Sequence, residues 1–212
     1  NGRSCVLDLG ANLECDEHNL VQFAIMGSAF SRFLLNIERP TVGLLNVGEE
    51  DQKGFDYLRV AAQTLSRDDM PVNYIGFVEG SDFSNGTVDV IVTDGFTGNI
   101  ALKTAEGVAQ LIRTFLRRAF AANLITKIGY LFARSALGKV RLMINPNNYN
   151  GAVFLGLNGI SVKSHGGTNA FGYAKAIGVA ADMVKNGYLP EVSQAIAKTN
   201  HILSEEKRDE NG

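Results

Sequence analysis

Apolar and polar positions follow two different periods along this chain. Short, almost uninterrupted apolar runs are typical of strands buried in a parallel sheet, whereas apolar positions that recur every three or four residues are typical of helices packed on a core. The predicted strands are residues 4–9, 41–47, 72–78, 88–93, 152–157 and 160–163. The predicted helices cover residues 55–65, 97–120, 169–186 and 190–204, with one more beginning near Asp16.

The alternation of strands and helices predicts an α/β fold. Parallel neighbouring strands need crossover connections, and helices in these connections cover both faces of the sheet. We therefore expect a three-layer α/β/α sandwich with a mostly parallel sheet. The 212 residues, 45% of them hydrophobic, are enough to bury a core. No repeat or low-complexity linker divides them, so residues 1–212 are expected to form one α/β domain.

The cysteines and the longest uncharged segment indicate the redox compartment of the protein and whether this segment spans a membrane. Cys5 and Cys15 lack a C-x-x-C spacing or a histidine partner, so neither a disulfide scaffold nor a metal site is expected, and a reducing cytoplasm fits best. The longest uncharged stretch, residues 142–162, is interrupted by Pro146 and by several asparagines and glycines. We therefore do not expect it to span a membrane.

Charge is distributed unevenly along the chain. Although the formal net charge is only −2, nine of the 20 basic residues and none of the 22 acidic residues lie between Gly107 and Ala181. Two interpretations stay open for this segment. It reflects drift in surface composition, or it forms a basic face for an anionic partner such as an acidic protein, phosphate groups or anionic lipid.

Glycine and polar residues follow several of the predicted strands. The four loops of this kind are residues 8–12, 46–54, 94–99 and 163–167. In an open parallel sheet, ligands bind beyond the carboxyl ends of the strands, so the functional site is expected at these loops. Gly95 and Gly98 allow a phosphate to approach the N–H groups at the start of the next helix. The same segment also fits a tight turn capped by Thr97 or Asn99, and it matches neither a Walker A loop nor G-x-G-x-x-G.

Five motifs carry a resemblance to a known family. They are residues 8–12, 24–28, 42–50, 93–99 and 102–104. With these motifs the chain resembles the phosphate:acyl-[acyl-carrier-protein] acyltransferases, the PlsX family of bacterial phospholipid synthesis, from Leu7 to the C-terminal helices. The resemblance implies a Rossmann-like fold similar to those of phosphotransacetylase and isocitrate dehydrogenase.

Two departures from the family pattern concern the completeness of the site. Family members carry a further N-terminal region with a Gly-Gly-Asp segment near its start, which this sequence lacks. Residues 164–169 are similar, but not identical, to the family's His-Gly-Ser-rich loop. The chain is therefore expected to be the C-terminal part of a longer enzyme, and this part alone is expected to be inactive if the further region completes the site.

The resemblance implies a phosphate acyltransferase. Such an enzyme transfers an acyl group from the thioester of acyl carrier protein to inorganic phosphate and makes an acyl phosphate for phospholipid synthesis. Phosphate is nucleophilic at neutral pH, so the reaction needs no serine or cysteine nucleophile and no cofactor. Cys15 is not expected to be a nucleophile, because no base lies near it in the sequence. Holding the reactants together and stabilising the developing charge would supply most of the rate.

Lys53 and Asn99 are the residues that the resemblance marks as catalytic. The Lys53 ammonium group would face phosphate or the developing oxyanion, and the Asn99 amide would donate to the same charge. His165 would protonate the leaving thiolate. The structural alternatives are a solvated loop lysine, a helix-capping asparagine and a loop histidine satisfied by the backbone. The residues expected to bind phosphate or substrate are Asn12, Asn46, Glu49, Asp94, Gly95, Thr97 and Gly98. The first three of these are equally compatible with stabilising turns.

Residues 113–141 combine apolar and basic side chains. Their pattern predicts a helix followed by a second, short helix, which together form an amphipathic hairpin with an apolar ridge flanked by cations. Such a ridge fits a homodimer contact alone, or a dimer whose tip also touches an anionic membrane from the cytoplasm. Acidic acyl carrier protein would use the same cations, and no nucleic-acid partner is expected. The residues expected at the membrane or partner contact are Arg117, Arg118, Lys127, Leu131, Phe132 and Arg134.

Three alternative functions are weighed against this one. A phosphotransacetylase-like enzyme would run the same reaction with acyl-coenzyme A, and the sequence separates the two poorly because both donors are anionic thioesters. A nicotinamide-dependent dehydrogenase is disfavoured by the missing G-x-G-x-x-G fingerprint. A membrane-surface adaptor that has lost catalysis would use only the basic region.

Overall fold

The computed structural model describes residues 4–143 and 145–209 and divides into two compact units. The first unit comprises the residues up to Asn99, Phe154–Ser161 and the residues from Ala180 onward. The second comprises Ile100–Val153 and Val162–Val179. The prediction of one domain over the whole chain is not tested by this division and stays a prediction.

A parallel four-stranded sheet forms the centre of the first unit. Its strands are β1 (Cys5–Leu7), β2 (Thr41–Leu45), β3 (Asn73–Val78) and β4 (Val90–Val92). They lie in the order β1-β4-β2-β3, with every neighbouring pair parallel. Each strand was predicted from an apolar run, and the α/β class with a parallel sheet is confirmed.

Helix α1 (Glu17–Leu34) covers one face of this sheet. The helix comes close to the strands at Gly27, where a Cβ atom would lie 2.6 Å from Val90 Cγ1 and 2.8 Å from Leu7 Cδ2. Helices α2 (Asp56–Leu65) and α7 (Tyr188–Asp209) both pack against α1. The rings of Phe30 and Tyr188 meet edge to face at 6.4 Å, which anchors the start of α7 on α1.

The opposite face of the sheet has its own apolar cluster. Successive side chains of a strand point to opposite faces, so Val6 and Ile91 point away from α1. They pack in one cluster with Leu45 and with Phe83 of the short helix α3 (Asp82–Asn85). Helical segments therefore lie on both faces, as the three-layer prediction requires.

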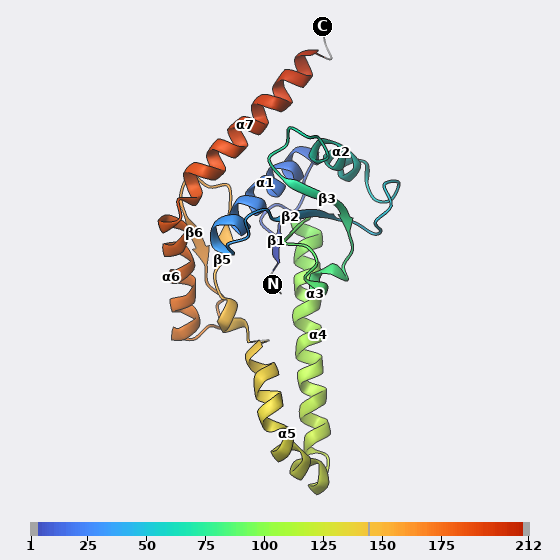
Figure 1. The fold of residues 1–212 in the computed structure, drawn as a ribbon. Coiled ribbons are helices and arrows are strands. Elements are labelled where there is room, and N and C mark those ends of the chain that lie inside the picture. The colour runs from blue at the N-terminus through green and yellow to red at the C-terminus, as the bar shows by residue number, and fades with distance from the viewer. Residues whose placement is uncertain (1–3, 144, 210–212) are drawn as a thin grey trace. The chain divides into compact units, whose positions relative to one another are not determined.

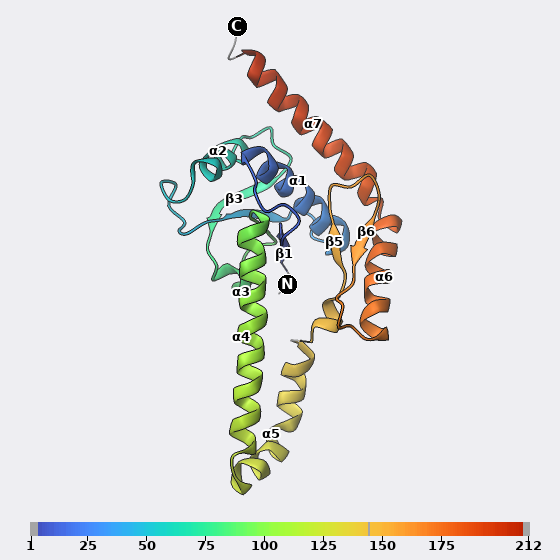
Figure 2. The same cartoon turned by 180° about the vertical axis from the view of Figure 1, so that it is seen from behind.

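The second unit contains two helices with little burial. Helix α4 (Gly95–Ala121) begins in the first unit and continues into the second, and α5 (Leu124–Met143) folds back from its end (Figures 1 and 2). Asn123 starts α5, because its Oδ1 accepts the N–H of Thr126 at 2.9 Å while its own N–H donates to Thr126 Oγ1 at 3.1 Å. The second helix was predicted to be short and spans 20 residues.

Shorter elements complete the chain. A 3₁₀ turn (Pro146–Tyr149) leads into a two-stranded sheet of β5 (Ala152–Phe154) and β6 (Ser161–Lys163), and α6 (Ala170–Lys185) follows. Helix α7 was predicted to begin at Pro190 and begins at Tyr188, because proline fits the first turn of a helix, where its missing N–H leaves no bond unmade. Among the described residues, no helix is long and apolar enough to cross a membrane.

Candidate active site

The strand order brings three loops to one edge of the sheet. All four strands are parallel, so their carboxyl ends share an edge, and β4 lies between β1 and β2. The start of α4, which follows β4, therefore lies between the loop after β1 and the loop after β2. Parallel α/β sheets bind ligands at this edge.

The loop after β1 packs directly on the first turn of α4. The carbonyl oxygen of Asn12 accepts the N–H of Gly95 at 2.8 Å. A Cβ atom at Gly95 would collide with that oxygen, and one at Gly98 would collide with the carbonyl oxygen of Asp8. The two glycines are thus needed for the close approach of the loop to the helix. They serve this packing whether or not a ligand binds.

Asp94 caps α4 and explains why the helix starts two residues earlier than predicted. Its carboxylate accepts the N–H of Thr97 at 2.7 Å and the Thr97 hydroxyl at 2.8 Å, and its carbonyl accepts the N–H of Gly98 at 2.9 Å. The N–H groups of Gly95, Thr97 and Gly98 are therefore all engaged within the protein. Phosphate binding at these residues stays a prediction, and side chains rather than these three N–H groups would hold the anion.

Asn99 lies inside α4 and not at its cap. The alternative that Asn99 or Thr97 caps the helix is wrong, because the helix begins at Gly95 and Asp94 performs that role. The Asn99 side chain is exposed and lies against Gly10, where a Cβ atom would be 3.4 Å from Asn99 Cβ and Cγ. The amide is thus free to meet a ligand beside the loop after β1.

Lys53 lies in the loop after β2, paired with Glu50. Its Nζ is 2.8 Å from Glu50 Oε2, with 49% and 64% of the two side chains exposed. The hydrogen bond from Lys53 lowers the pKa of Glu50, and the bond to Glu50 raises the pKa of Lys53, so both groups are charged at neutral pH. Glu49, the neighbour that was expected to line the site, is exposed.

Asn46 holds the loop that carries Lys53. This buried side chain donates from Nδ2 to the carbonyl oxygen of Lys53 at 3.0 Å and accepts the N–H of Val47 at 2.8 Å. Its backbone N–H donates to Val78 of β3. Asn46 therefore has the turn-stabilising role that was one of its two interpretations, and its contact with substrate stays a prediction.

His165 belongs to the second unit. Its Nδ1 accepts the N–H of Gly167 at 3.0 Å, which places the proton of the neutral ring on Nε2. Its backbone N–H donates to Asn150 Oδ1 at 2.8 Å, and the buried Asn150 amide also donates to Ser164 Oγ at 2.8 Å and to the Gly172 carbonyl at 2.9 Å. The side chain of Asn150 thus holds the loop of His165 in place.

Asp8 organises the loop after β1 and Asn150 organises the loop of His165, and neither was among the predicted site residues. Both are buried polar residues, with 8% and 7% of their surface exposed. The position of Asp8 in the sequence could have indicated its role. A charged residue directly after a buried strand needs hydrogen-bond donors nearby, and the following loop supplies them. Asn150 lies among four asparagines between positions 145 and 150, and nothing in the sequence distinguishes it from the other three.

The environment of Cys15 disfavours a thiolate. Burial raises the pKa of its thiol, and the carboxylates of Asp8, Asp94 and Asp16 raise it further, despite a hydrogen bond from the Gly95 backbone. Burial likewise raises the pKa of Tyr57, with a contribution from Asp94. Neither group is poised for nucleophilic or base catalysis. Within the described residues, no three His, Cys, Asp or Glu side chains are grouped to hold a metal ion.

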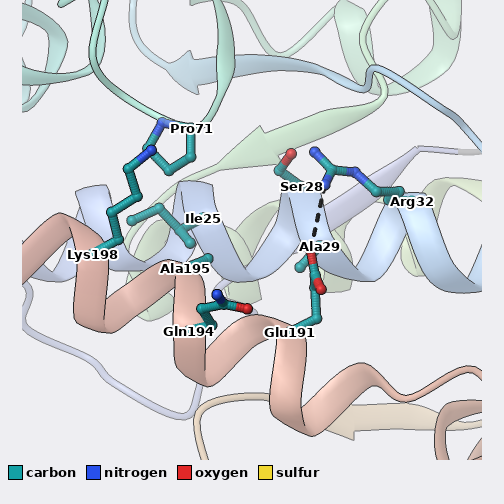
Figure 3. A pocket seen from close by; sticks show the side chains of 9 residues that line it. All are labelled: Ile25, Ser28, Ala29, Arg32, Pro71, Glu191, Gln194, Ala195 and Lys198. Carbon is teal, nitrogen blue, oxygen red and sulfur yellow. Dashed lines mark ion pairs between the residues drawn. The ribbon is translucent and has the colours of Figure 1, made fainter.

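A cavity of about 260 Å³ lies elsewhere in the first unit, between α1 and α7 (Figure 3). Arg32 and Glu191 pair across it at 3.7 Å, and Lys198 lies near Pro71 at its other end. None of the predicted site residues lines it. The cavity is therefore separate from the loops at the carboxyl ends of the strands.

Comparison with known proteins places most of the chain in one family. Residues 1–190 match the family described as "Fatty acid synthesis protein". The chain is similar to the "Phosphate acyltransferase" of Paramagnetospirillum magneticum, with 57% identity over 88% of this chain and 53% of that protein. It is 58% identical to the protein of that name from Rhodospirillum centenum, over 95% of this chain and 57% of the relative. The chain thus spans little more than half the length of these curated relatives.

Proposed function

Because the chain belongs to the Fatty acid synthesis protein family, we propose that the protein transfers an acyl group from a carrier thioester to inorganic phosphate. The observation that supports this best is the placement of α4 between two loops. The amide of Asn99 lies beside the loop after β1, and Lys53 extends from the loop after β2. An amide donor and an ammonium group are the kinds of groups that stabilise phosphate and a thioester oxyanion.

The reaction balances without a cofactor. A phosphate oxygen attacks the thioester carbonyl carbon, a C–O bond forms, and the carbonyl electrons move onto oxygen. When this tetrahedral intermediate collapses, the C–S bond breaks and the thiolate leaves with its electron pair. The proton that hydrogen phosphate loses as the acyl phosphate forms passes to the thiolate, so the products are an acyl phosphate and a thiol. The protein has to orient the phosphate and stabilise two transient negative charges.

Lys53 is the proposed phosphate ligand. Its Nζ already holds one anionic oxygen, that of Glu50, at 2.8 Å. A phosphate dianion carries more charge than a carboxylate and would replace Glu50 in this pair. The half-exposed position of Lys53 allows this exchange, while Asn46 holds the backbone beneath it.

His165 is the proposed partner of the leaving sulfur. The bond from Gly167 N–H to Nδ1 leaves the Nε2 proton free to donate. Through this Nε2–H the ring would stabilise the leaving thiolate by a hydrogen bond.

Acyl carrier protein is the proposed acyl donor, with the exposed cations of α4 and α5 as its contact. Arg117, Arg118, Lys127 and Arg134 are all exposed, and acidic residues are absent from the sequence between Gly107 and Ala181. An acidic carrier would be attracted to this surface at low salt. Acyl-coenzyme A is the alternative donor.

We further propose that α4 and α5 form a homodimer contact whose tip touches an anionic membrane from the cytoplasm. No described side chain from residue 100 to residue 142 is buried. Phe132 is 86% exposed, Ile125 81% and Leu131 60%. Exposed apolar side chains of this size, alternating with cations, are typical of subunit interfaces and of membrane-surface helices.

The deciding experiment follows free thiol in the protein expressed from its complete gene. With acyl carrier protein as donor, thiol release should depend on added phosphate and should be accompanied by acyl phosphate. The same assay with acyl-coenzyme A separates the two donors. Thiol release that is independent of phosphate would indicate a thioesterase and would contradict the proposal.

A further inference from the structure

Asp8 is a buried carboxylate beside the candidate site that the proposed mechanism does not use. It directly follows β1 and is only 8% exposed. Its Oδ1 accepts the N–H groups of Gly10 at 2.8 Å and Ala11 at 2.9 Å. Its Oδ2 accepts the N–H of Asn12 at 2.7 Å and the Asn12 side-chain amide at 2.8 Å. A carboxylate has about four acceptor positions, so the loop occupies all of them and leaves none for a reactant.

These bonds keep Asp8 ionised. Burial raises the pKa of the carboxyl group, but the hydrogen bonds from Ala11, Asn12 and Gly10 outweigh it and hold the pKa below its usual value. An asparagine at this position would turn an NH₂ group toward donors of Asn12. Donor would then face donor in a buried site, and the loop would have to move.

Both ends of this loop are tied to the structure that carries Asn99. Asp8 N–H donates to the Thr93 carbonyl at 2.8 Å, which extends the pairing of β1 with β4. At the other end, the Asn12 carbonyl accepts from Gly95 in the first turn of α4. The carbonyl of Asp8 itself lies so close to Gly98 that no Cβ atom fits there. The loop is therefore a bridge between the sheet and the start of α4.

Gly10 is the part of this bridge that meets Asn99. Its φ of +119° is favourable only for glycine, and a Cβ atom there would lie 3.4 Å from Asn99 Cγ and 3.6 Å from Asn99 Oδ1. The backbone of Gly10 thus lies directly beside the Asn99 amide. Asp8 fixes the position of this backbone, because its carboxylate accepts the N–H of Gly10.

We propose that Asp8 is a positioning residue for Asn99, which acts by holding residues 10–12 in the conformation that sets the place of the Asn99 amide. The inference rests on the proposed function, in which that amide donates to the transient negative charge. Asp8 touches neither reactant, and it contributes only through Asn99.

Kinetics of Asp8→Asn test this role in the protein expressed from its complete gene. Displacing a catalytic group by about 1 Å costs on the order of 10²-fold, so kcat should fall by about that factor. KM for phosphate and for the acyl donor should stay within about threefold, because transition-state contacts rather than substrate binding are lost. In an Asn99→Ala background, Asp8→Asn should lower kcat by less than about threefold more, since residues that act as a unit are not additive. Full multiplication of the two effects, or retention of more than about half of the activity, would overturn the inference.

Two further variants separate positioning from folding. Asp89→Asn is the matched control, because Asp89 accepts the N–H and hydroxyl of Thr41 at 2.9 and 2.8 Å at the opposite, amino ends of β2 and β4. It should lower stability and leave kcat unchanged. Gly10→Ala keeps Asp8 and strains the loop beside Asn99, so it decides the question if Asp8→Asn does not fold. It should reproduce the loss in kcat and its non-additivity with Asn99→Ala, and a normal kcat would overturn the inference.

A readout without catalysis distinguishes failure of this inference from failure of the proposed function. In Asp8→Asn, amide hydrogen exchange at residues 10–12 should accelerate, and the side-chain amide resonances of Asn99 should shift. Asp89→Asn should change neither. If the unmodified protein releases no thiol with phosphate, the proposed function fails, and unchanged Asn99 resonances in Asp8→Asn would then refute the positioning role independently.

Discussion

Lys53 forms an ion pair with Glu50, whereas Asn99 lies beside Gly10, and substitution of each residue tests its proposed role in catalysis. Lys53→Ala removes the ammonium group and releases Glu50, whereas Asn99→Ala removes only an exposed amide beside Gly10. We expect each to lower the rate of acyl phosphate formation by ~10²–10³, the usual cost of one oxyanion-type donor. The effect on melting temperature should be small, because neither side chain is buried.

The measurement is phosphate-dependent thiol release beside a thermal melt of each variant. Arg59→Ala is a suitable control for Lys53→Ala, because Arg59 forms a comparable exposed ion pair with Asp56 in α2. If both site variants keep more than about half of the activity with unchanged melting, the assignment of the site is wrong.

Cys15 is close to the site without belonging to it, and its substitution should be tolerated. Its Sγ lies 3.6 Å from the Asn12 carbonyl, and burial together with nearby carboxylates keeps its pKa raised. Cys15→Ser conserves a weak donor at this place and should keep activity within about twofold. Alkylation of the native protein at neutral pH should be slow at Cys15 for the same reason. A loss comparable to that of Lys53→Ala would show that the thiol takes part in the reaction.

At the scale of elements, the first turn of α4 is the segment where phosphate should be detected. Its backbone donors at Gly95, Thr97 and Gly98 are already bonded, so the anion should rely on Lys53, the proposed phosphate ligand, and on the dipole of the helix. Titration with phosphate should shift the amide resonances of residues 95–99 and the side-chain amide of Asn99. Shifts confined to a different loop would move the phosphate site there, and chloride at equal ionic strength serves as control.

The periodicity of apolar residues was sufficient to predict most elements. The runs at residues 41–47 and 88–93 became β2 and β4, and Asp16 caps α1 as its position before an amphipathic segment indicated. The length of the second helix in the amphipathic segment was underestimated, because a short helix was predicted and α5 runs from Leu124 to Met143. Residues 124–143 contain no buried side chain among those described, so no core-facing stripe marked its end.

The site was predictable at the level of loops and less so at the level of roles. Parallel strands indicate at which edge ligands bind, and this predicted which loops carry the site. The choice of Lys53 and Asn99 within these loops came from the family resemblance and stays a prediction. A polar side chain in such a loop binds either a ligand or the neighbouring backbone. The choice depends on the orientation of the side chain, which the sequence does not reveal. Asn46 was expected either to face substrate or to stabilise a turn, and Asp94 to bind phosphate or substrate. The structure shows both bonded to neighbouring backbone, and their contact with substrate stays a prediction.

At the scale of the whole molecule, the exposed helices α4 and α5 should decide where the protein works. Several basic residues near an anionic bilayer contribute about 1 kcal/mol each, and inserted apolar side chains add to this. Leu131→Glu or Phe132→Glu should therefore sharply reduce binding to vesicles that contain anionic lipid. Binding of the unmodified protein should rise with anionic lipid content and weaken in high salt.

Val184→Glu is the control for this prediction, because Val184 is an exposed apolar residue of α6, with 70% exposure, that lies outside the basic segment. Vesicle sedimentation and the oligomeric state should be measured for all three variants. If Leu131→Glu and Phe132→Glu dissociate a dimer and leave vesicle binding unchanged, α4 and α5 form a subunit interface only.

The central place of β4 in the sheet also has a consequence for synthesis on the ribosome. β4 is the last of the four strands to emerge, yet both β1 and β2 need it as a neighbour. Until Val92 has left the exit tunnel, the face of α1 that packs on β4 stays uncovered in the nascent chain. Such delayed, non-local pairing is slow and exposes apolar surface that chaperones recognise. A nascent chain that stalls before Val90 should therefore be sensitive to protease, and one that stalls well after α4 should be protected.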